Sequence, residues 1–400
     1  MGIGRTDVSS HSSNSSETKP WVIMVPGVIP GEKVVVKIFR NFPNYSEADL
    51  VEILQASPER TVPPCPIADA CGGCQWQHMS ISLQREWKTR LVQEALEQYG
   101  VTYSEIQPCL GTDETLHYRS KLTPHYQQPA KSKRGVQNEK HIEAIGFQKQ
   151  TSRQIIDVTE CLIATPAVNA AYQAARDQLL SEPSTKKKGA TLLFRQANLD
   201  DDYVESDHRV FLTTVVDGLK FTYRAGNFFQ NNYYVLPIMV QELVAQAIKG
   251  DQMTHLADCY CGSGLFALSA AKHFDRVVGI EVNDLAIEEA TTNAVANSIS
   301  NVEFLSASAE GIFKVIQDFP RETSVVVVDP PRKGCSEEFL EQLYTFSPQR
   351  IVYMSCDPTT QARDAAGILK AGYSTTYIQP FDLFPQTRHI ECLMVFEKKV

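Results

Sequence analysis

Cys356 is the residue of this chain whose setting most favours covalent chemistry. It stands in Met354-Ser355-Cys356-Asp357-Pro358, directly after an apolar run of strand length. A cysteine thiol has an ordinary pKa of about 8.5 and becomes a nucleophile once its thiolate is stabilised. A lone cysteine is more often a small buried apolar residue. The position at the end of a strand, beside Asp and Pro, favours the nucleophile.

His389 and Glu391 are the candidates for a base that would work beside Cys356. They occur in His389-Ile390-Glu391, within a run that predicts a strand. Residues two apart on a strand share a face, so the imidazole and the carboxylate would lie together, with Ile390 on the other face. Either group can remove a proton. Spacing alone does not choose between them.

Residues 258–264 (DCYCGSG) predict a turn between a strand and a helix that a nucleotide can approach closely. Glu281 follows at the end of the next predicted strand, where a carboxylate can accept hydrogen bonds from ribose hydroxyls. The pattern alone is not specific, because Gly262, Gly264 and Ala267 also fit the spacing of an enzyme that binds NAD.

A later predicted strand ends in Asp329-Pro330-Pro331-Arg332. This motif distinguishes methyltransferases from enzymes that bind NAD. The carboxyl ends of parallel strands line the ligand crevice, and two prolines fix a rigid turn that holds Asp329 toward it. Dehydrogenases have no use for this element. Methyltransferases of amino groups carry a similar acid or amide before Pro-Pro, followed by an aromatic residue that stacks on the target base. Here Arg332 follows, so we expect a target atom other than an exocyclic amine.

A thiol in such a crevice has a purpose in one kind of methyl transfer. C5 of uracil is a poor nucleophile, but addition of a thiolate to C6 gives an enolate whose C5 can attack the sulfonium methyl group of S-adenosylmethionine. The C5 proton must then leave before the thiol is eliminated, which requires a base near Cys356. The residues therefore predict a methyltransferase with Cys356 as covalent nucleophile.

A second group of cysteines points to a metal site. The chain has ten cysteines and no apolar secretory signal, which favours metal binding or catalysis over a disulfide framework. Cys65, Cys71 and Cys74 lie close together. Structural zinc normally uses two paired Cys-x-x-Cys motifs and this region has one, so we expect an iron-sulfur cluster. Cys109 and Cys161 are the candidates for a fourth ligand.

The elements that must position these groups indicate three domains, at residues 1–61, 62–225 and 226–400. Short β-branched runs broken by Pro-Gly pairs over residues 21–54 predict a small antiparallel barrel, and residues 82–99 predict a helix.

After residue 250, apolar strand-length runs alternate with helical stretches, which indicates an α/β fold with a doubly wound, Rossmann-like parallel sheet. Residues 389–397 predict one further strand, antiparallel and at the edge. The predicted parallel strands are residues 254–259, 276–282, 302–306, 324–329 and 350–355.

Composition limits the possible partners. A net charge of -9 argues against a protein that coats nucleic acid without selectivity, and no apolar run approaches the roughly 20 residues that span a bilayer. Residues 117–153 nevertheless hold eight Lys or Arg against two Glu. This excess fits docking of a polyanion, and fits a solvated loop around Lys131, Lys133 and Arg134 equally well. Residues 1–20 are Ser-rich and predict a flexible loop.

These residues together resemble the RNA uracil-C5 methyltransferases, in particular members with an N-terminal TRAM domain and a 4Fe-4S cluster, similar to 23S rRNA uracil-5-methyltransferases. The resemblance covers nearly the whole chain. The segments that carry it are Val25-Pro26-Gly27, Pro30-Gly31-Glu32, Tyr45-Ser46-Glu47-Ala48, Cys65-Pro66, Cys71-Gly72-Gly73-Cys74, Phe228-Phe229-Gln230-Asn231-Asn232, Ser355-Cys356-Asp357-Pro358 and Phe384-Pro385-Gln386-Thr387.

The resemblance implies a role for each site residue. Cys356 would be the nucleophile, and Glu391 rather than His389 the proton acceptor. S-adenosylmethionine would be bound by residues on four separate segments, and the cluster by four cysteines that include Cys161 and not Cys109. The implied cofactor contacts are Gln230, Tyr260, Glu281 and Asp329, and the implied cluster ligands are Cys65, Cys71, Cys74 and Cys161.

The resemblance also implies a Rossmann-like class I methyltransferase domain, an OB-like TRAM barrel and a mixed α+β domain between them. The barrel is expected to be incomplete, with its first strand missing before Met1 and an insertion at residues 9–19. We expect a cytoplasmic monomer with no membrane partner that acts on RNA, and ribosomal RNA in preference to transfer RNA.

Two alternatives stay open. An RNA cytosine-C5 methyltransferase would use the same chemistry, but those enzymes place their nucleophile in differently composed Pro-Cys or Thr-Cys motifs. A non-catalytic iron-sulfur RNA-binding protein would have no need of both Cys356 and Glu391.

Overall fold

The fold is described from a computed structural model of the chain. It covers residues 2–8, 19–128, 130–131, 140–150, 152–182, 184, 188–250 and 253–399. The Ser-rich stretch at residues 9–18 lies outside the described residues, as do Lys133 and Arg134, and only the backbone of Lys131 is described. The interpretations placed on those residues stay predictions.

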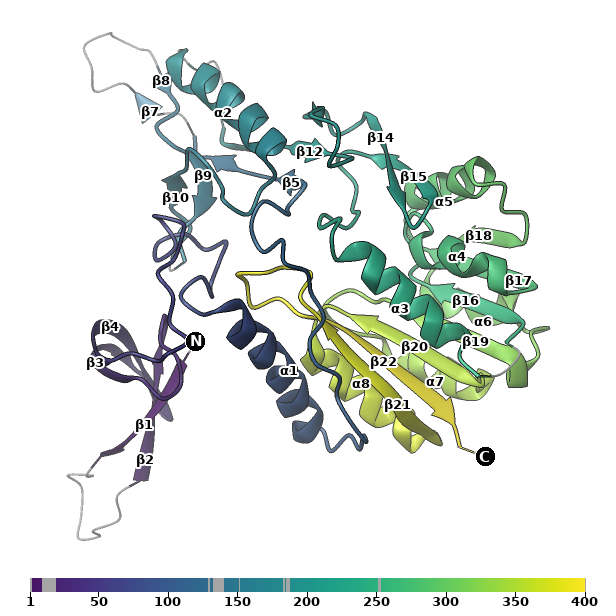
Figure 1. Cartoon of the computed structure of the whole chain (residues 1–400). Coiled ribbons are helices and arrows are strands. Elements are labelled where there is room, and N and C mark those ends of the chain that lie inside the picture. The colour runs from purple at the N-terminus through teal and green to yellow at the C-terminus, as the bar shows by residue number, and fades with distance from the viewer. Residues whose placement is uncertain are drawn as a thin grey trace.

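A seven-stranded sheet in the C-terminal half forms the centre of the molecule (Figure 1). Its order is β18-β17-β16-β19-β20-β22-β21, and it is parallel except that β22 runs antiparallel to both of its neighbours. The chain order reverses between β16 and β19, which is where doubly wound sheets bind their ligands. The strands are β16 (His255–Cys259), β17 (Arg276–Glu281), β18 (Val302–Ser306), β19 (Ser324–Val328), β20 (Arg350–Ser355), β21 (Tyr373–Phe381) and β22 (Glu391–Lys398).

The predicted α/β sheet is confirmed, with one error in its order. The five predicted parallel strands and the antiparallel last strand are all present. β22 was wrongly predicted at the edge, because β21 was not predicted at all and occupies that edge. The sequence of β21, YSTTYIQPF, has no continuous apolar run. It also contains Pro380, which an edge strand tolerates because one side of its backbone needs no partner.

Helices cover both faces of this sheet. One buried core joins α3, α4 and α5 to the β14–β15 hairpin, and the other joins α6, α7, α8 and α1. Every residue of β19 and β20 is buried, as expected for parallel strands covered on both faces. The helices are α1 (Ile81–Gln98), α2 (Pro166–Ser181), α3 (Leu236–Ile248), α4 (Leu265–Ala270), α5 (Asp284–Ala296), α6 (Ile312–Val315), α7 (Glu337–Phe346) and α8 (Pro358–Lys370).

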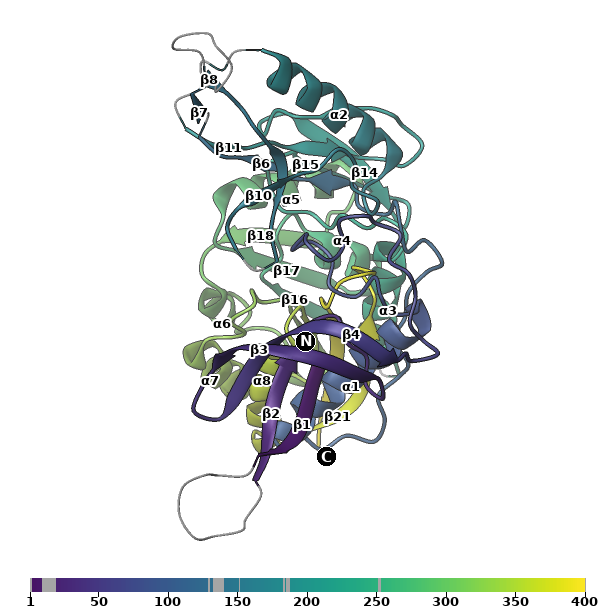
Figure 2. The same cartoon turned by 90° about the vertical axis from the view of Figure 1, so that its left-hand side faces the viewer.

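The predicted helix at residues 82–99 is confirmed as α1, which lies between the N-terminal strands and the seven-stranded sheet (Figures 1 and 2). Ser80 caps it, since its Oγ accepts a hydrogen bond from the backbone N–H of Leu83 at 3.1 Å. Val92 and Leu96 pack into the same core as α8. The polar residues Gln84 and Lys88 are buried on this face as well.

The N-terminal strands form a four-stranded sheet with the order β1-β2-β4-β3 (Figure 2). The flexible loop predicted for residues 1–20 was wrong over residues 2–8, which pair antiparallel with β2. This strand exists through its pairing rather than through an apolar pattern of its own. The sheet is also not wholly antiparallel, because β2 and β4 are parallel. The strands are β1 (Gly2–Val8), β2 (Lys19–Val25), β3 (Lys33–Asn41) and β4 (Tyr45–Gln55).

Residues 121–205 combine short strands with α2 around a small separate core, which is the mixed α+β arrangement expected there, and the β14–β15 hairpin that follows packs on the core of the large sheet. Among the described residues, no helix is both long enough and apolar enough to cross a lipid bilayer. The strands are β5 (Lys121–Leu122), β6 (His125–Tyr126), β7 (Ala130–Lys131), β8 (Lys140–His141), β9 (Ile145–Gln148), β10 (Ile155–Asp157), β11 (Ala190–Thr191), β12 (Phe194–Gln196), β13 (Val204–Glu205), β14 (Phe211–Val216) and β15 (Leu219–Arg224).

Candidate active site

The sheet brings five of the predicted site residues together where the parallel strands end. This row of strand ends is here called the site edge. Tyr260 directly follows β16, Glu281 ends β17, Asp329 follows β19 and Cys356 follows β20. β22 runs in the opposite direction, so its first residue, Glu391, lies at the same edge. The site edge is therefore the ligand-binding end of a doubly wound sheet.

The register of β20 and β22 places Cys356 next to Glu391. Ser355 is paired with Cys392, so the next residue of each strand toward the site edge is Cys356 on one and Glu391 on the other. The two side chains are close enough to interact electrostatically. The negative charge of the Glu391 carboxylate adds to the effect of burial in raising the pKa of the Cys356 thiol. The predicted nucleophile and the predicted base therefore lie side by side.

Buried carboxyl groups dominate the electrostatics of the site edge. Burial raises the pKa of Glu391 and of Asp258 to about 8 each, and the charge of Asp329 adds to both shifts. Burial alone raises the pKa of Asp329 to about 7. These groups repel one another when ionised, so a cationic ligand would favour their ionised forms.

The Cys356 thiol responds to the same surroundings. Burial, Glu391 and Asp329 together raise its pKa to about 11, and the Arg332 guanidinium opposes them. Arg332 also lowers the pKa of Glu391. The positive charge of Arg332 therefore favours the ionised forms of both Cys356 and Glu391.

His389 differs from Glu391 in its surroundings. Its Nδ1 lies 3.4 Å from Nη2 of Arg332. Burial and the neighbouring cations, chiefly Arg332 and Arg388, lower the pKa of His389 to about 4. An imidazole with so low a pKa is a weak proton acceptor near neutral pH, whereas a carboxyl near 8 is well matched to that task.

The turn between β16 and α4 has the shape of a cofactor cradle. Tyr260, Gly262 and Gly264 have φ angles of 77°, 54° and 88°, all in the left-handed region. Tyr260 is a strained residue in this conformation, of the kind found at functional sites. A Cβ added to Gly262 would meet nothing within 4 Å, so there is open space over this turn.

Asp258 lies under this turn, and only one of its two carboxylate oxygens has a hydrogen-bond partner among the described residues. Its Oδ2 accepts a hydrogen bond from the backbone N–H of Ala267 at 2.9 Å. Its Oδ1 is buried and has no hydrogen-bond partner among the described residues. Such an orphaned oxygen in a native fold calls for a missing partner.

Gln230 lies on the segment between β15 and α3, which is fixed at both ends. Asn227 Nδ2 donates to Glu289 Oε1 on α5 at 2.7 Å, and Asn232 Nδ2 donates to the carbonyl of Leu383 at 2.8 Å. The segment therefore connects α5 to the turn that precedes Glu391. Gln230 itself is half-buried.

Four of the predicted metal ligands lie around one cavity. Cys65, Cys71, Cys74 and Cys161 line a cavity of about 170 Å³. Burial raises the pKa of Cys74 to about 12, and the other three thiols contribute to the shift. The ten cysteines, all within the described residues, are free thiols.

Cys109 lies elsewhere, buried beside Asp382 and Lys88, so the structure brings Cys161 rather than Cys109 to the other three cysteines. Across the described parts of the chain, no three His, Cys, Asp or Glu side chains are close enough together to hold a single metal ion. A cluster that offers each thiolate a different iron requires a wider arrangement than one ion does.

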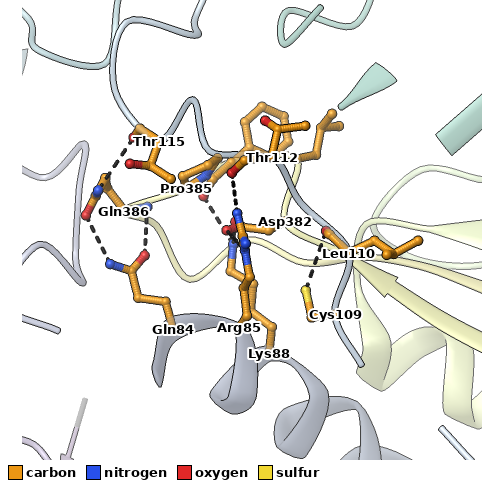
Figure 3. Close-up of polar contacts among 12 residues, drawn as sticks. Gln84, Arg85, Lys88, Cys109, Leu110, Thr112, Thr115, Asp382, Pro385 and Gln386 are labelled. Carbon is orange, nitrogen blue, oxygen red and sulfur yellow. Dashed lines mark hydrogen bonds and ion pairs between the residues drawn. The ribbon is translucent and has the colours of Figure 1, made fainter. Parts of the chain in front are cut away.

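Sequence reasoning missed a polar network beneath the site edge. Lys88 Nζ donates to Asp382 Oδ1 at 2.5 Å, and both side chains are fully buried (Figure 3). The available signal was the spacing of Gln84, Lys88 and Val92, which places two polar residues on the buried stripe of a helix. Nothing in the sequence indicated that their partners lie at residues 382–386.

Comparisons with known proteins agree with one another. A family model described as tRNA (Uracil-5-)-methyltransferase matches residues 168–399. The tRNA (uracil(54)-C(5))-methyltransferase of Schizosaccharomyces pombe is 36% identical over 398 residues, covering 95% of this chain and 74% of its own length. The protein of the same name from Saccharomyces cerevisiae is 31% identical, covering 96% of this chain and 70% of its own length.

The crystal structure of Pyrococcus abyssi tRNA (uracil-54, C5)-methyltransferase in complex with S-adenosyl-L-homocysteine has a TM-score of 0.71 at 22% sequence identity. The match covers 94% of this chain and 95% of the archaeal chain. The two proteins share a fold along nearly their entire lengths.

The buried carboxyl of Glu391 predicts a pH-dependent stability. Its pKa is about 8 in the folded protein against an ordinary value of 4.5, so the unfolded chain releases this proton at lower pH than the folded one. Stability then falls as pH rises from about 4.5 to about 8. Glu391→Gln escapes this loss, so it should stabilise the protein at pH 8 by on the order of 2 kcal/mol and change little at pH 4.5.

Thermal unfolding of both proteins at the two pH values measures this difference. Glu94→Gln is the control, because Glu94 is an exposed residue of α1 that is solvated in both states. Equal unfolding temperatures of native protein and Glu391→Gln at both pH values would show that Glu391 is not a buried acid.

Proposed function

Because the chain belongs to the tRNA (uracil-5-)-methyltransferase family, we propose that it methylates a uracil of transfer RNA at C5 through a covalent adduct on Cys356. Family membership makes it an S-adenosylmethionine-dependent RNA uracil-C5 methyltransferase. The observation that carries the covalent route is the register of β20 and β22, which sets Cys356 beside Glu391.

The site edge fits S-adenosylmethionine, which when bound supplies a methyl group on a positively charged sulfonium. Glu281 at the end of β17 would accept hydrogen bonds from the ribose hydroxyls. The other parts of the cofactor would be held by Tyr260, Asp329 and Gln230. The unpartnered oxygen of Asp258 and the raised pKa values of the buried carboxyls both favour a cationic, hydrogen-bonding ligand here.

The reaction begins on Cys356. Arg332 favours loss of the thiol proton, because its charge lowers the pKa of Cys356. The thiolate then forms a bond to C6 of the uracil, and the electron pair of the C5–C6 double bond moves into the ring as an enolate. C5 becomes nucleophilic and takes the methyl group from the sulfonium, whose bond to the methyl carbon breaks so that the sulfur leaves as a neutral thioether.

Glu391 completes the reaction. It removes the proton from C5, the C5–C6 double bond re-forms, and the bond between sulfur and C6 breaks to release the thiolate. A carboxyl with a pKa of about 8 can accept this proton and return it to solvent near neutral pH. His389, with its pKa lowered to about 4, is the poorer candidate.

The rim of the site edge suits an unpaired base. Phe228, two residues before Gln230, is 80% exposed. An aromatic ring left in water on a fixed segment is a stacking platform for a nucleobase of single-stranded RNA. The target uracil must leave its own stack to reach Cys356, at a cost of a few kcal/mol that is smallest in loops.

Transfer RNA replaces ribosomal RNA as the proposed substrate. The two yeast relatives are named for uracil 54 of transfer RNA, and they align with at least 95% of this chain. The same names refer to uracil, so the alternative of a cytosine-C5 methyltransferase is not retained. Neither is that of a non-catalytic RNA-binding protein.

We also propose that Cys65, Cys71, Cys74 and Cys161 hold a 4Fe-4S cluster. Four thiols line one cavity, and burial raises the pKa values of Cys71, Cys74 and Cys161, which matches a cavity that a thiolate-binding metal group would fill. Methyl transfer needs no electron, so the cluster would support the fold or position the RNA.

Replacement of the nucleophile and of the base should give opposite effects on the covalent adduct. Cys356→Ala should abolish both 5-methyluridine and any covalent protein–RNA complex, because no thiolate can add to C6. Glu391→Gln should accumulate the complex, because the C5 proton cannot leave. Denaturing gel electrophoresis with labelled RNA and nucleoside mass spectrometry measure both. Full methylation by Cys356→Ala would exclude the covalent route.

The RNA itself can be tested with matched transcripts. A transfer RNA transcript should gain 5-methyluridine at position 54, the position in the yeast relatives' names, and the same transcript with cytosine there should gain none. Methylation of a ribosomal RNA fragment but not of the transfer RNA would reverse the proposed substrate.

The proposed cluster predicts a difference between Cys74 and Cys109. Cys74→Ala should lose iron, acid-labile sulfide and visible absorbance after anaerobic purification, because Cys74 lines the cavity. Cys109→Ala is the matched control and should retain all three, since Cys109 lies beside Lys88 instead. Equal iron contents in the two variants, or no iron in the native protein, would contradict the proposed cluster.

A further inference from the structure

Residues 382–390, here called the base turn, join β21 to β22 and end directly before Glu391. The position of Glu391 therefore depends on what holds this turn as well as on the pairing of β22 with β20. Four successive carbonyls of the base turn accept hydrogen bonds from separate parts of the chain. The pairs are Asn232 Nδ2 to Leu383 O (2.8 Å), Lys88 Nζ to Phe384 O (3.2 Å), Tyr118 Oη to Pro385 O (3.0 Å), and Gln75 N and Trp76 N to Gln386 O (3.1 and 3.0 Å).

Gln84 of α1 fixes the tightest point of the base turn. Its Oε1 accepts from the backbone N–H of Gln386 at 2.9 Å, and its Nε2 donates to Gln386 Oε1 at 3.0 Å (Figure 3). Gln386 has a φ of 70°, which is unfavourable for any residue with a side chain. A residue stays in this region only when its surroundings hold it there.

Lys88, one helical turn further along α1, holds the start of the base turn. Its Nζ is paired with Asp382 Oδ1 at 2.5 Å, with both side chains fully buried. Arg85 approaches the other carboxylate oxygen of Asp382 at 3.4 Å. A buried ion pair is weak support for overall stability, and its best-attested use is to specify one arrangement of the elements that carry it.

The nucleophile is held by different elements. Cys356 lies between β20 and α8, and Asp357 caps α8 by accepting from the N–H groups of Thr359 and Thr360 at 3.0 and 3.3 Å. The contacts of Gln84 and Lys88 reach the base turn and not this segment. A displaced base turn would therefore move Glu391 and leave Cys356 in place.

We propose that Gln84 and Lys88 are positioning residues for the second half of the reaction, holding the base turn so that Glu391 reaches the C5 proton. This inference rests on the covalent route proposed above. α1, which lies outside the sheet and carries no reacting group, thereby sets the rate at which the adduct resolves.

The experiment separates formation of the adduct from its decay in a single turnover on transfer RNA. In Gln84→Ala the adduct should form at close to the native rate and decay about tenfold more slowly or worse, because a small misplacement of a catalytic group costs at least that much. The adduct should therefore accumulate on denaturing gels, as in Glu391→Gln but to a lesser extent.

A second variant guards against misfolding. Lys88→Met alone would leave Asp382 buried without its cation, so Lys88→Met is combined with Asp382→Asn, which removes both charges. This double variant should show the same selective slowing of decay. Gln93→Ala, at an exposed position of α1, is the matched control and should behave as the native protein does.

The outcomes are distinct. Slowing of formation and decay by the same factor in both variants would indicate a purely structural role and overturn the inference, as would decay rates equal to that of Gln93→Ala. Absence of any adduct and of 5-methyluridine with the native protein would instead contradict the proposed function.

Discussion

The antiparallel pairing of β22 with β20 is the constraint on which the site depends. A set of parallel strands can bring to this edge only residues that end or follow a strand. β22 runs the other way and brings the first residue of its own strand, Glu391, to the same edge. A slip of one residue would turn every side chain of β22 to the opposite face. Glu391 would then point away from Cys356.

Several contacts exclude that slip. Gln361 of α8 donates from Nε2 to the carbonyls of Tyr353 and Cys392, one on each strand, at 3.0 and 2.9 Å. At the far end of the pair, Arg350 on β20 meets Glu397 on β22 at 3.0 Å. The register is thus fixed by side chains at both ends, and the reacting pair is a consequence of it.

Burial of the carboxyl groups at the site edge lowers the stability of the fold and suits the proposed proton transfer. The pKa of Glu391 is raised because ionisation without solvent is unfavourable, and the same raised pKa makes the group a competent proton acceptor. Ionisation of these buried carboxyls therefore costs stability, as is common at functional sites. Arg332 limits the loss, since its charge lowers the pKa values of Glu391 and Cys356 together.

The parts of this structure that could be predicted from sequence are those with a local signal. β16 to β20 are apolar runs, and the position of Cys356 at the end of a parallel strand followed from them. β21 was missed because its Ser, Thr and Pro residues carry no strand pattern.

The choice between His389 and Glu391 had no local signal either. Both residues belong to one motif, and they differ because burial lowers the pKa of the His389 imidazole and raises that of the Glu391 carboxyl. Arg332, which a separate loop supplies, lowers the pKa of His389 further. The role proposed for Gln84 and Lys88 likewise depends on partners far along the chain, which the sequence does not indicate.

That distance has a consequence for how the enzyme is made. Gln84 and Gln386 are 302 positions apart, so α1 leaves the ribosome long before its partner exists. Until Asp382 is synthesised, Lys88 lacks its buried counter-ion. Contacts this remote in sequence close late in folding. The contacts of α1 with the base turn can therefore form only after β21 has been synthesised, so the segment before Glu391 is held in place only once the chain is nearly complete.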